Sequence, residues 1–260
     1  MPKQQINLGF MSMRHAGMRQ RVEAAAGAGF DGISLRADQW QQSRDSGWDA
    51  TRIQSLLLQH GLRVSEVEPM RFLRDDLLDT VEEMVQAFKV PRVQVTPPLD
   101  GKPLDLDRVA RWLRRAAARL PDTQLAIEFL PPTSVPDAPS AQRLIDLAGA
   151  APNLGFCVDS WHVFRGGGLA SLEAIDAQRV FVIQINDGPM QATVDDYIDD
   201  CIRFRQPCGD GAFDLRGFLR LLPPQAPVNV EVINTELDKR PAAEVARLLF
   251  ESTQRCLRQR

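Results

Sequence analysis

Residues 124–159 read QLAIEFLPPTSVPDAPSAQRLIDLAGAAPNLGFCVD, and this stretch contains a strand, a helix and a second strand in that order. Residues 124–129 and 154–159 are short apolar runs that predict buried strands, while residues 140–150 carry apolar side chains at helical spacing. Two strands joined by a helix pair in parallel, because the connection has to cross back over the sheet before the second strand begins. The stretch therefore predicts an α/β fold.

The same alternation extends along the whole chain. Strands are predicted at residues 6–10, 32–36, 63–68, 92–96, 124–129, 154–159, 180–185 and 228–233. Helices are predicted at 18–28, 49–60, 75–88, 106–120, 140–150 and 242–257, with shorter ones at 169–176 and 215–222. Such alternation predicts a single-domain (β/α)8 TIM barrel over residues 1–260, with its active site at the C-terminal ends of the strands. A doubly wound open sheet is the alternative, but no GxGxxG turn follows the first strand.

The composition is that of an ordinary globular protein. Of the 260 residues 44% are hydrophobic, and 31 basic against 34 acidic residues give a formal charge of −3. Because a basic excess is absent, we expect no nucleic-acid partner. No apolar run approaches the roughly 20 residues that span a bilayer, and the start MPKQQINLGF lacks the apolar core of a secretory signal, so we expect no membrane partner and a cytoplasmic protein. The four cysteines have no CxxC spacing and are expected to be reduced thiols.

Polar side chains recur near the ends of the last four predicted strands. In strand 124–129, Leu125, Ile127 and Phe129 share one face, which leaves Ala126 and Glu128 on the other. In a barrel the second face points inward, and its last side chain lies at the mouth. The same alternation applied to all four strands predicts that these side chains converge: Glu128, Asp159, Gln184 and Glu231.

Three carboxylates that converge in a buried place need a counter-charge, and a divalent cation is the simplest one. All four side chains offer oxygen ligands, which favour Mn²⁺ or Mg²⁺ and are compatible with Co²⁺ or Zn²⁺. An acid near a strand end is more often a solvated rim residue or the partner of a Lys or Arg. The repetition on four consecutive strands is what favours one metal site.

Five segments resemble the xylose isomerase-like TIM barrels, a superfamily of sugar phosphate isomerases and epimerases that also includes inosose and 3-dehydroshikimate dehydratases. They are AIEF around Glu128, GFCVDSWHVFRGG around Asp159 and His162, VIQINDGP around Gln184 and Asp187, RQPCGDGAFDL from Arg205, and VNVEVIN around Glu231. The resemblance implies one divalent ion held by Glu128, Asp159, Gln184 and Glu231. It also implies that Arg205 binds the substrate.

Two positions depart from the pattern of the family. Gln184 stands where many relatives have His, a departure shared with some members, notably among the dehydratases. It weakens an automatic choice of epimerase. Cys208 stands where the family's RxxPGxG motif usually has Pro, although Pro207 is adjacent and residues 209–211 keep the turn.

These residues predict proton chemistry next to a carbonyl. A metal ion that binds a carbonyl and a neighbouring hydroxyl acidifies the adjacent C–H and stabilises the enediolate left after proton removal. Glu128 and Glu231 are expected on opposite sides of the site, each as both ligand and proton carrier. We therefore predict a metal-dependent isomerase or epimerase of a small sugar or polyhydroxy ketone. The alternative is a dehydratase of an inosose-like or 3-dehydroshikimate-like ring, in which His162 protonates the departing hydroxide.

Three residues are expected to bind the substrate, a small polyhydroxy carbonyl compound. Arg205 can hold a carboxylate, phosphate or hydroxyl by paired hydrogen bonds. His15 follows the first strand and would face the mouth of the barrel. Asp187 could hold Arg205 or His162 in place, or form a turn before Gly188. A homo-oligomer is compatible with the sequence.

Two other classes are less favoured. The DNA repair endonuclease of the same superfamily needs a histidine-rich zinc site, whereas this chain has three histidines and a negative net charge. A barrel that binds a sugar or a metal without turnover has no need for the Glu128 and Glu231 pair.

Overall fold

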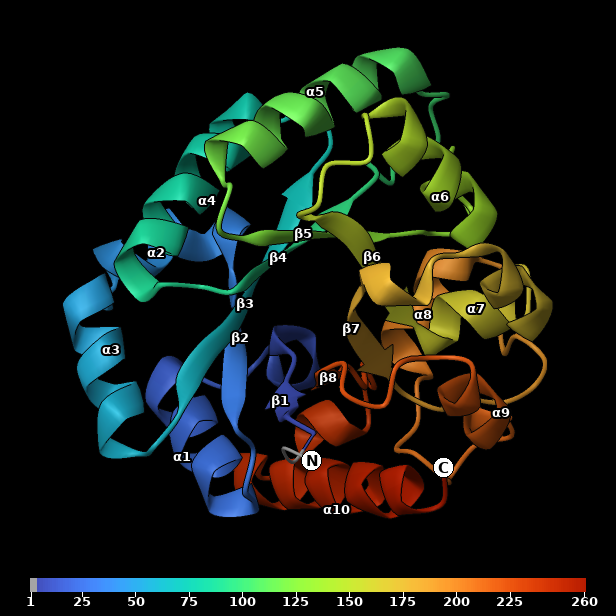
Figure 1. Cartoon of the computed structure of the whole chain (residues 1–260). Helices are drawn as coiled ribbons and strands as arrows, with labels where there is room; N and C mark the ends of the chain where they lie inside the picture. Colours follow the sequence, from blue (N-terminus) through green and yellow to red (C-terminus); the bar gives the residue numbers. More distant parts are fainter. Residues whose placement is uncertain (1–3) are drawn as a thin grey trace.

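Eight parallel strands form a closed barrel (Figure 1). The computed structural model describes residues 4–260. The strands are β1 (Ile6–Leu8), β2 (Gly32–Arg36), β3 (Arg63–Arg71), β4 (Arg92–Thr96), β5 (Gln124–Glu128), β6 (Leu154–Asp159), β7 (Val180–Ile185) and β8 (Val228–Val230). Each strand pairs in parallel with the next one in the sequence, and β8 pairs with β1. The predicted (β/α)8 barrel is confirmed.

Helices connect the strands and surround the barrel. They are α1 (Met18–Ala28), α2 (Trp40–Asp45), α3 (Ala50–Gln59), α4 (Asp75–Phe88), α5 (Leu106–Arg119), α6 (Ala138–Leu147), α7 (Ser160–Arg165), α8 (Tyr197–Arg203), α9 (Leu215–Arg220) and α10 (Ala242–Arg258). Short 3₁₀ helices are η1 (Phe10–Met13), η2 (Ala37–Gln39), η3 (Leu169–Ala174), η4 (Ala177–Arg179) and η5 (Leu237–Lys239). In Figure 1, α10 lies against α1 and joins the two ends of this ring. Within residues 4–260 no helix combines the length and the apolar character needed to cross a membrane.

The differences from the predicted elements have local causes. β1 and β8 end at Leu8 and Val230, before the predicted ends, because Gly9 N–H donates to the carbonyl of Val230 and the chain then enters η1. The helix predicted at 169–176 is the 3₁₀ helix η3. Helices α2, α7 and α8 were not predicted, since six or seven residues are too few for the helical period to become visible in the sequence.

The helix α6 shows how a capping interaction sets an element boundary. The Asp137 side chain accepts a hydrogen bond from Ser140 N at 2.9 Å, and Ser140 Oγ accepts one from Asp137 N at 3.1 Å. This capping box satisfies free N–H groups of the first turn. The helix therefore begins at Ala138, two residues before the predicted start at Ser140.

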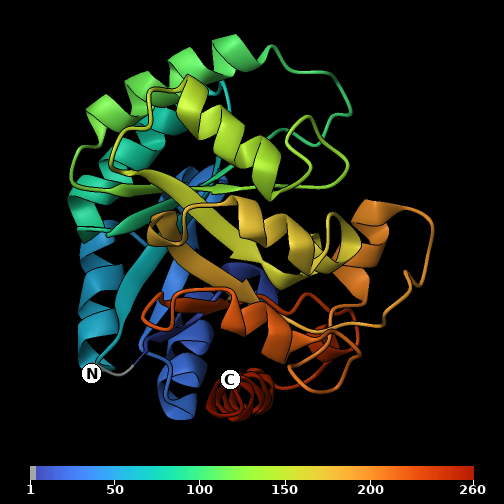
Figure 2. The ribbon, with the colours of Figure 1, turned by 45° about the vertical axis from the view of Figure 1, so that its right-hand side comes forward.

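Strand side chains pack in two separate environments. Those that point outward form the main core with the helices. A second apolar cluster, separate from the first, contains the side chains that alternation places inside the barrel. These are Ala126, Cys157 and Val182, together with Phe181. Two residues further along β5, β6 and β7, the same face carries Glu128, Asp159 and Gln184. Figure 2 shows the chain after β7 extending beyond the C-terminal ends of β6 and β7.

Two buried glutamates of β3 continue the polar lining of the barrel. Glu66 Oε2 lies 3.8 Å from Arg92 Nη1, and Glu66 Oε1 accepts a hydrogen bond from Asn229 Nδ2. Glu68 accepts hydrogen bonds from Ser34 Oγ at 2.6 Å and from Phe10 N at 3.1 Å. Burial raises the pKa of Glu66 to about 7, and burial together with the neighbouring Glu66 raises the pKa of Glu68 to about 8.

The raised pKa of Glu68 predicts how stability depends on pH. The folded protein keeps a proton that the unfolded chain releases above the ordinary pKa of 4.5, so the free energy of unfolding falls as pH rises from about 5 to 8. One such proton gives a slope of about 1.4 kcal/mol per pH unit. Glu68→Gln keeps an oxygen for Ser34 and Phe10 and should make the slope shallower. Urea unfolding with chelator at several pH values measures this, with the exposed Glu251→Gln as control; an unchanged slope in Glu68→Gln would contradict the prediction.

Candidate metal and active site

A cavity of about 140 Å³ opens at the C-terminal ends of the strands. Four of the predicted site residues line it: Glu128, His162, Arg205 and Glu231. Asp159 and Gln184 are fully buried at the ends of the neighbouring strands β6 and β7, where their Cα atoms are paired in register. The structure thus brings six predicted residues together from four consecutive strands and the segments that follow them.

Glu128, Asp159 and His162 form a group that could hold a metal ion. Each offers one ligand atom, and these atoms all lie within 4.8 Å of one another. His162 is on α7, which starts directly after β6, and its Nε2 lies 3.2 Å from Glu128 Oε1 and 3.8 Å from Asp159 Oδ2. Asp159 also caps α7 by accepting a hydrogen bond from Trp161 N at 2.7 Å. The group shares Glu128 and Asp159 with the predicted ligand set and adds His162.

The imidazole of His162 connects two acids of the cavity. Burial lowers its pKa to about 4, so the ring is neutral at pH 7. Its Nδ1 makes a hydrogen bond with the hydroxyl of Tyr197 on α8. Burial raises the pKa of Tyr197 above its ordinary value, so this hydroxyl is a neutral phenol. Tyr197, His162 and Glu128 therefore lie in a row, and with Nδ1 bound to Tyr197 the Nε2 atom is the one left to bind a metal ion.

Arg205 provides the positive charge of the site. Its Nη1 donates to Asp159 Oδ2 at 2.8 Å and to Glu231 Oε2 at 3.0 Å, and its Nη2 lies 3.0 Å from Cys201 Sγ. Burial alone would lower the pKa of Arg205. The carboxylates of Asp159 and Glu231 outweigh this effect and hold the pKa well above its ordinary value, so the guanidinium stays charged. Burial alone would raise the pKa of Asp159, but Arg205 and His162 lower it, and this carboxylate is ionised.

For the carboxyl groups of Glu128 and Glu231, the positive charge of Arg205 does not offset the cost of burial. Burial and repulsion from Asp159 raise the pKa of Glu128 to about 8, against a smaller opposing effect of Arg205. Burial raises the pKa of Glu231 well above its ordinary value in spite of Arg205. Each group gains from a nearby cation when it ionises. The cavity therefore has the electrostatic character of a cation site.

Gln184 gives an independent test of whether the residues fit a metal ion. Its side chain is fully buried, yet neither its amide oxygen nor its amide nitrogen has a hydrogen-bond partner within the described residues. A buried amide without partners is costly, and an oxygen of this kind is a suitable ligand for a hard cation. Glu128, Asp159 and His162 could hold a divalent ion, and the Gln184 oxygen on the neighbouring strand has the chemistry of a further ligand.

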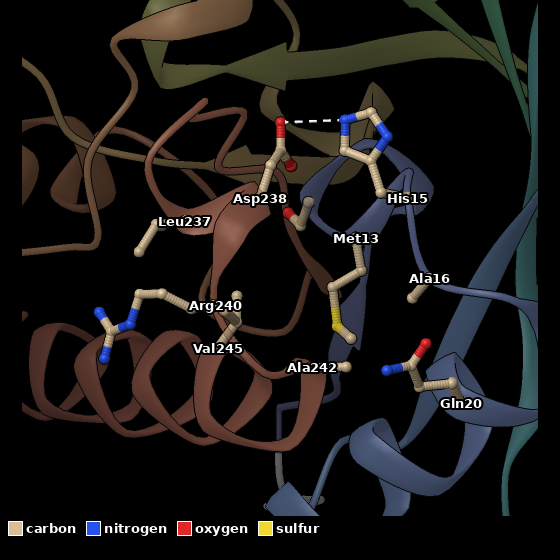
Figure 3. Close-up of a pocket in the computed structure, with 10 residues that line it drawn as sticks. Met13, His15, Ala16, Gln20, Leu237, Asp238, Arg240, Ala242 and Val245 are labelled. Carbon is tan, nitrogen blue, oxygen red and sulfur yellow. Dashed lines mark ion pairs between the residues drawn. The ribbon is translucent and has the colours of Figure 1, made fainter.

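His15 does not reach this cavity. Its side chain is 64% exposed and its Nε2 lies 3.3 Å from Asp238 Oδ2. Figure 3 shows the pair at a separate small pocket between the segment after β1 and the start of α10, where Gln20 and Arg240 also lie. The segment after β1 turns away through η1, which places His15 on the outer rim. The structure gives no support to His15 as a substrate ligand.

Asp187 holds a loop rather than lining the cavity. Its Oδ1 accepts hydrogen bonds from Gly188 N at 2.8 Å and Phe213 N at 3.0 Å, and its Oδ2 accepts one from Gly209 N at 2.9 Å. A Cβ at residue 211 would lie 2.2 Å from Asp187 Oδ1, so the loop can close around this side chain only with Gly211. Asp187 thus fixes the segment that follows Arg205, and its contact with Gly188 N agrees with the expected turn.

Two residues that form hydrogen bonds with His162 or Glu128 were not predicted from the sequence: Tyr197 and Gln94. Tyr197, the only tyrosine of the chain, lies in a connection without periodicity, and no local pattern marks it. Gln94 Nε2 donates to Glu128 Oε2 at 3.1 Å. A signal for Gln94 was present, because the alternation of RVQVT in β4 puts Gln94 on the same face as Arg92 and Thr96.

The family of the chain follows from comparison with known proteins. A family model described as xylose isomerase-like TIM barrel matches residues 22–254. This chain belongs to that family. No curated protein is significantly similar to it in sequence.

Solved structures of the family share the fold over nearly the whole chain. An IolI protein with a bound zinc atom has 17% identity and a TM-score of 0.85, covering 97% of this chain and 98% of that one. The probable 3-DHS dehydratase AsbF from Bacillus anthracis has 14% identity and a TM-score of 0.76, covering 96% and 98%. D-psicose 3-epimerase from Clostridium cellulolyticum H10, solved with D-tagatose, has 10% identity and a TM-score of 0.70, covering 97% and 98%. At these identities the likeness shows the fold.

The loop function of Asp187 can be tested by Asp187→Asn. The amide keeps one acceptor oxygen but places an NH₂ group against a backbone N–H, so the free energy of unfolding should fall by roughly 1–3 kcal/mol. Urea unfolding measures the loss, and Asp210→Asn, exposed in the same loop, is the matched control. Equal stability of both variants would argue against the loop function.

Proposed function

We propose that this protein is a divalent-metal-dependent isomerase or epimerase that acts on a small sugar or polyhydroxy ketone. The observation that carries the proposal is the pair of buried carboxyl groups, Glu128 and Glu231, in one cavity with a group able to hold a cation. Both have raised pKa values because of burial, which suits groups that exchange protons near neutral pH. Family membership supports the same class of chemistry.

Glu128, Asp159 and His162 would hold the ion, with the free Gln184 oxygen as a fourth ligand. Glu231 lines the same cavity, and Arg205 joins it to Asp159. When bound, a divalent ion would polarise the substrate carbonyl and acidify the neighbouring C–H. Mn²⁺ or Mg²⁺ suits the carboxylate and amide oxygens, while an imidazole in the ligand set also suits Zn²⁺ or Co²⁺.

The protein's own residues supply the proton chemistry. One carboxylate removes the proton next to the carbonyl, and the second carboxylate returns a proton to the other face or to the neighbouring carbon. Return to the opposite face inverts the centre, which is epimerisation. Return to the neighbouring carbon moves the carbonyl, which is ketose–aldose isomerisation. Arg205 would hold Glu231 in position and offer a positive charge to a substrate oxygen.

Dehydration of a cyclic polyhydroxy ketone is the second candidate. Tyr197 favours it, because a departing hydroxide needs a proton from a neutral acid. The phenol of Tyr197 is neutral and lines the cavity. The same phenol could instead protonate a substrate oxygen during isomerisation, so product analysis has to decide between the two reactions.

Metal binding should release protons. At pH 7 Glu128, with a pKa of about 8, is mostly protonated without the ion, and its carboxylate is needed as a ligand. Mn²⁺ affinity should therefore rise as pH increases toward 8. Calorimetry of Mn²⁺ binding in two buffers with different ionisation enthalpies counts the protons.

Two variants sharpen this experiment. Asp159→Asn should weaken Mn²⁺ binding by at least the roughly 10–100-fold seen when a supporting residue of a metal site is lost. Glu128→Gln should weaken binding and also abolish most of the proton release. The exposed Asp210→Asn should behave like the wild type. Unchanged affinity in Asp159→Asn would remove the metal site from the proposal.

Exchange of substrate protons into D₂O distinguishes the candidate reactions. With Mn²⁺ present, a screen of polyhydroxy ketones and cyclic ketols by proton NMR should find exchange next to the carbonyl. Glu128→Gln and Glu231→Gln should each slow it by roughly 10²–10⁴-fold. An isomer as product supports the first candidate, and loss of water that Tyr197→Phe slows supports the second. Tight binding without exchange would identify a binding protein instead.

A further inference from the structure

Cys208 and Cys256 line one pocket on the outer side of the barrel, away from the cavity at its mouth. Cys208 belongs to the loop of residues 205–211, here called the Arg205 loop, and is buried. Its Sγ lies 3.7 Å from the hydroxyl of Thr253 on α10. Cys256 lies one helical turn further along α10 and is partly exposed. Because residues three apart on a helix lie on the same face, the Cys208 thiol lies beside the turn of α10 that carries Cys256.

An open pocket gives reagents access to this pair. Its volume is about 420 Å³, and both cysteines line it together with Arg216 and Arg255. The two remaining thiols do not line this pocket. Cys157 is fully buried inside the barrel, and Cys201 is buried against Arg205.

The two thiols differ in a way that suits disulfide chemistry. The neighbouring Cys208 thiol lowers the pKa of Cys256, which favours the Cys256 thiolate. The neighbouring Cys256 thiol and burial raise the pKa of Cys208, which stays a thiol. A partly exposed thiolate beside a second thiol is the arrangement of cysteines that oxidise to a disulfide.

We propose that Cys208 and Cys256 form a modification site at which a hydroperoxide produces an intramolecular disulfide. The Cys256 thiolate attacks one peroxide oxygen, the O–O bond breaks, and water or an alcohol leaves, which gives a sulfenic acid. The Cys208 sulfur then attacks the Cys256 sulfur, forms the S–S bond and releases water. Two thiols and one hydroperoxide thus give one disulfide, one water and one further water or alcohol.

The disulfide would tie the Arg205 loop to α10. Residue 208 is three positions from Arg205, whose guanidinium joins Asp159 and Glu231. Asp187 already fixes the other side of this loop through Gly209 and Phe213. Oxidation would therefore hold the loop from both sides. This site does not depend on the proposed catalytic activity, since neither thiol lines the cavity at the mouth.

Peptide mapping of the wild-type chain tests the proposal. After treatment with hydrogen peroxide, free thiols are blocked and the protein is digested with trypsin without reductant. Cleavage after Arg205, Arg216, Arg255 and Arg258 puts Cys208 in peptide 206–216 and Cys256 in peptide 256–258. We expect these two peptides as one cross-linked species, lighter than their sum by two hydrogen atoms and separated by reductant.

Variants and controls complete the experiment. Cys256→Ser should lose the cross-link, and Cys157→Ser should retain it. Separately blocked peptides 206–216 and 256–258 after oxidation of the wild type would overturn the proposal. A sulfinic acid on Cys256, or a cross-link that joins two chains, would overturn it as well. Since the mapping uses the wild type, a folding defect in a variant does not affect the decision.

Discussion

Three carboxyl groups in one buried place are the constraint on which the rest of this site depends. The barrel brings Glu128, Asp159 and Glu231 to its mouth, and burial penalises the charge of each. Arg205 supplies one positive charge and shares it between Asp159 and Glu231. The compensation is unequal, because the pKa of Asp159 is lowered while the pKa values of both glutamates are raised. Asp159 is therefore ionised, while a cation nearby would favour ionisation of Glu128 and Glu231.

The position of Arg205 depends in turn on backbone geometry outside the cavity. Asp187 at the end of β7 binds three backbone N–H groups and draws the segment after Arg205 against the strand. Gly211 permits this approach because a side chain there would collide with the Asp187 carboxylate. A residue that the sequence placed near the substrate therefore acts through the loop that carries the arginine. The segment from Arg205 to Gly211 therefore packs against Asp187 and also carries Arg205 to the cavity.

The sequence predicted the barrel and the inward residues because both follow from strand period. Alternation alone placed Glu128, Asp159 and Gln184 above Ala126, Cys157 and Val182, and the structure has the same faces. Contacts made by loops were not predictable in this way. His15 turns away with η1, and Tyr197 reaches His162 from a helix of seven residues. Such contacts depend on loop conformation, which no periodic pattern records.

The two sides of the cavity differ in how protons can move, and this difference bears on the reaction. On the side of Glu128, His162 Nδ1 is bound to the hydroxyl of Tyr197 and His162 Nε2 lies 3.2 Å from Glu128 Oε1. Glu231 is bound to Arg205, whose guanidinium cannot give up its proton and only stabilises the carboxylate. The pKa of Glu231 is raised all the same, so both glutamates gain from a cation, and what differs between the two sides is the neutral phenol of Tyr197 beside His162. A neutral O–H donor on one side only favours protonation of a substrate oxygen from that side.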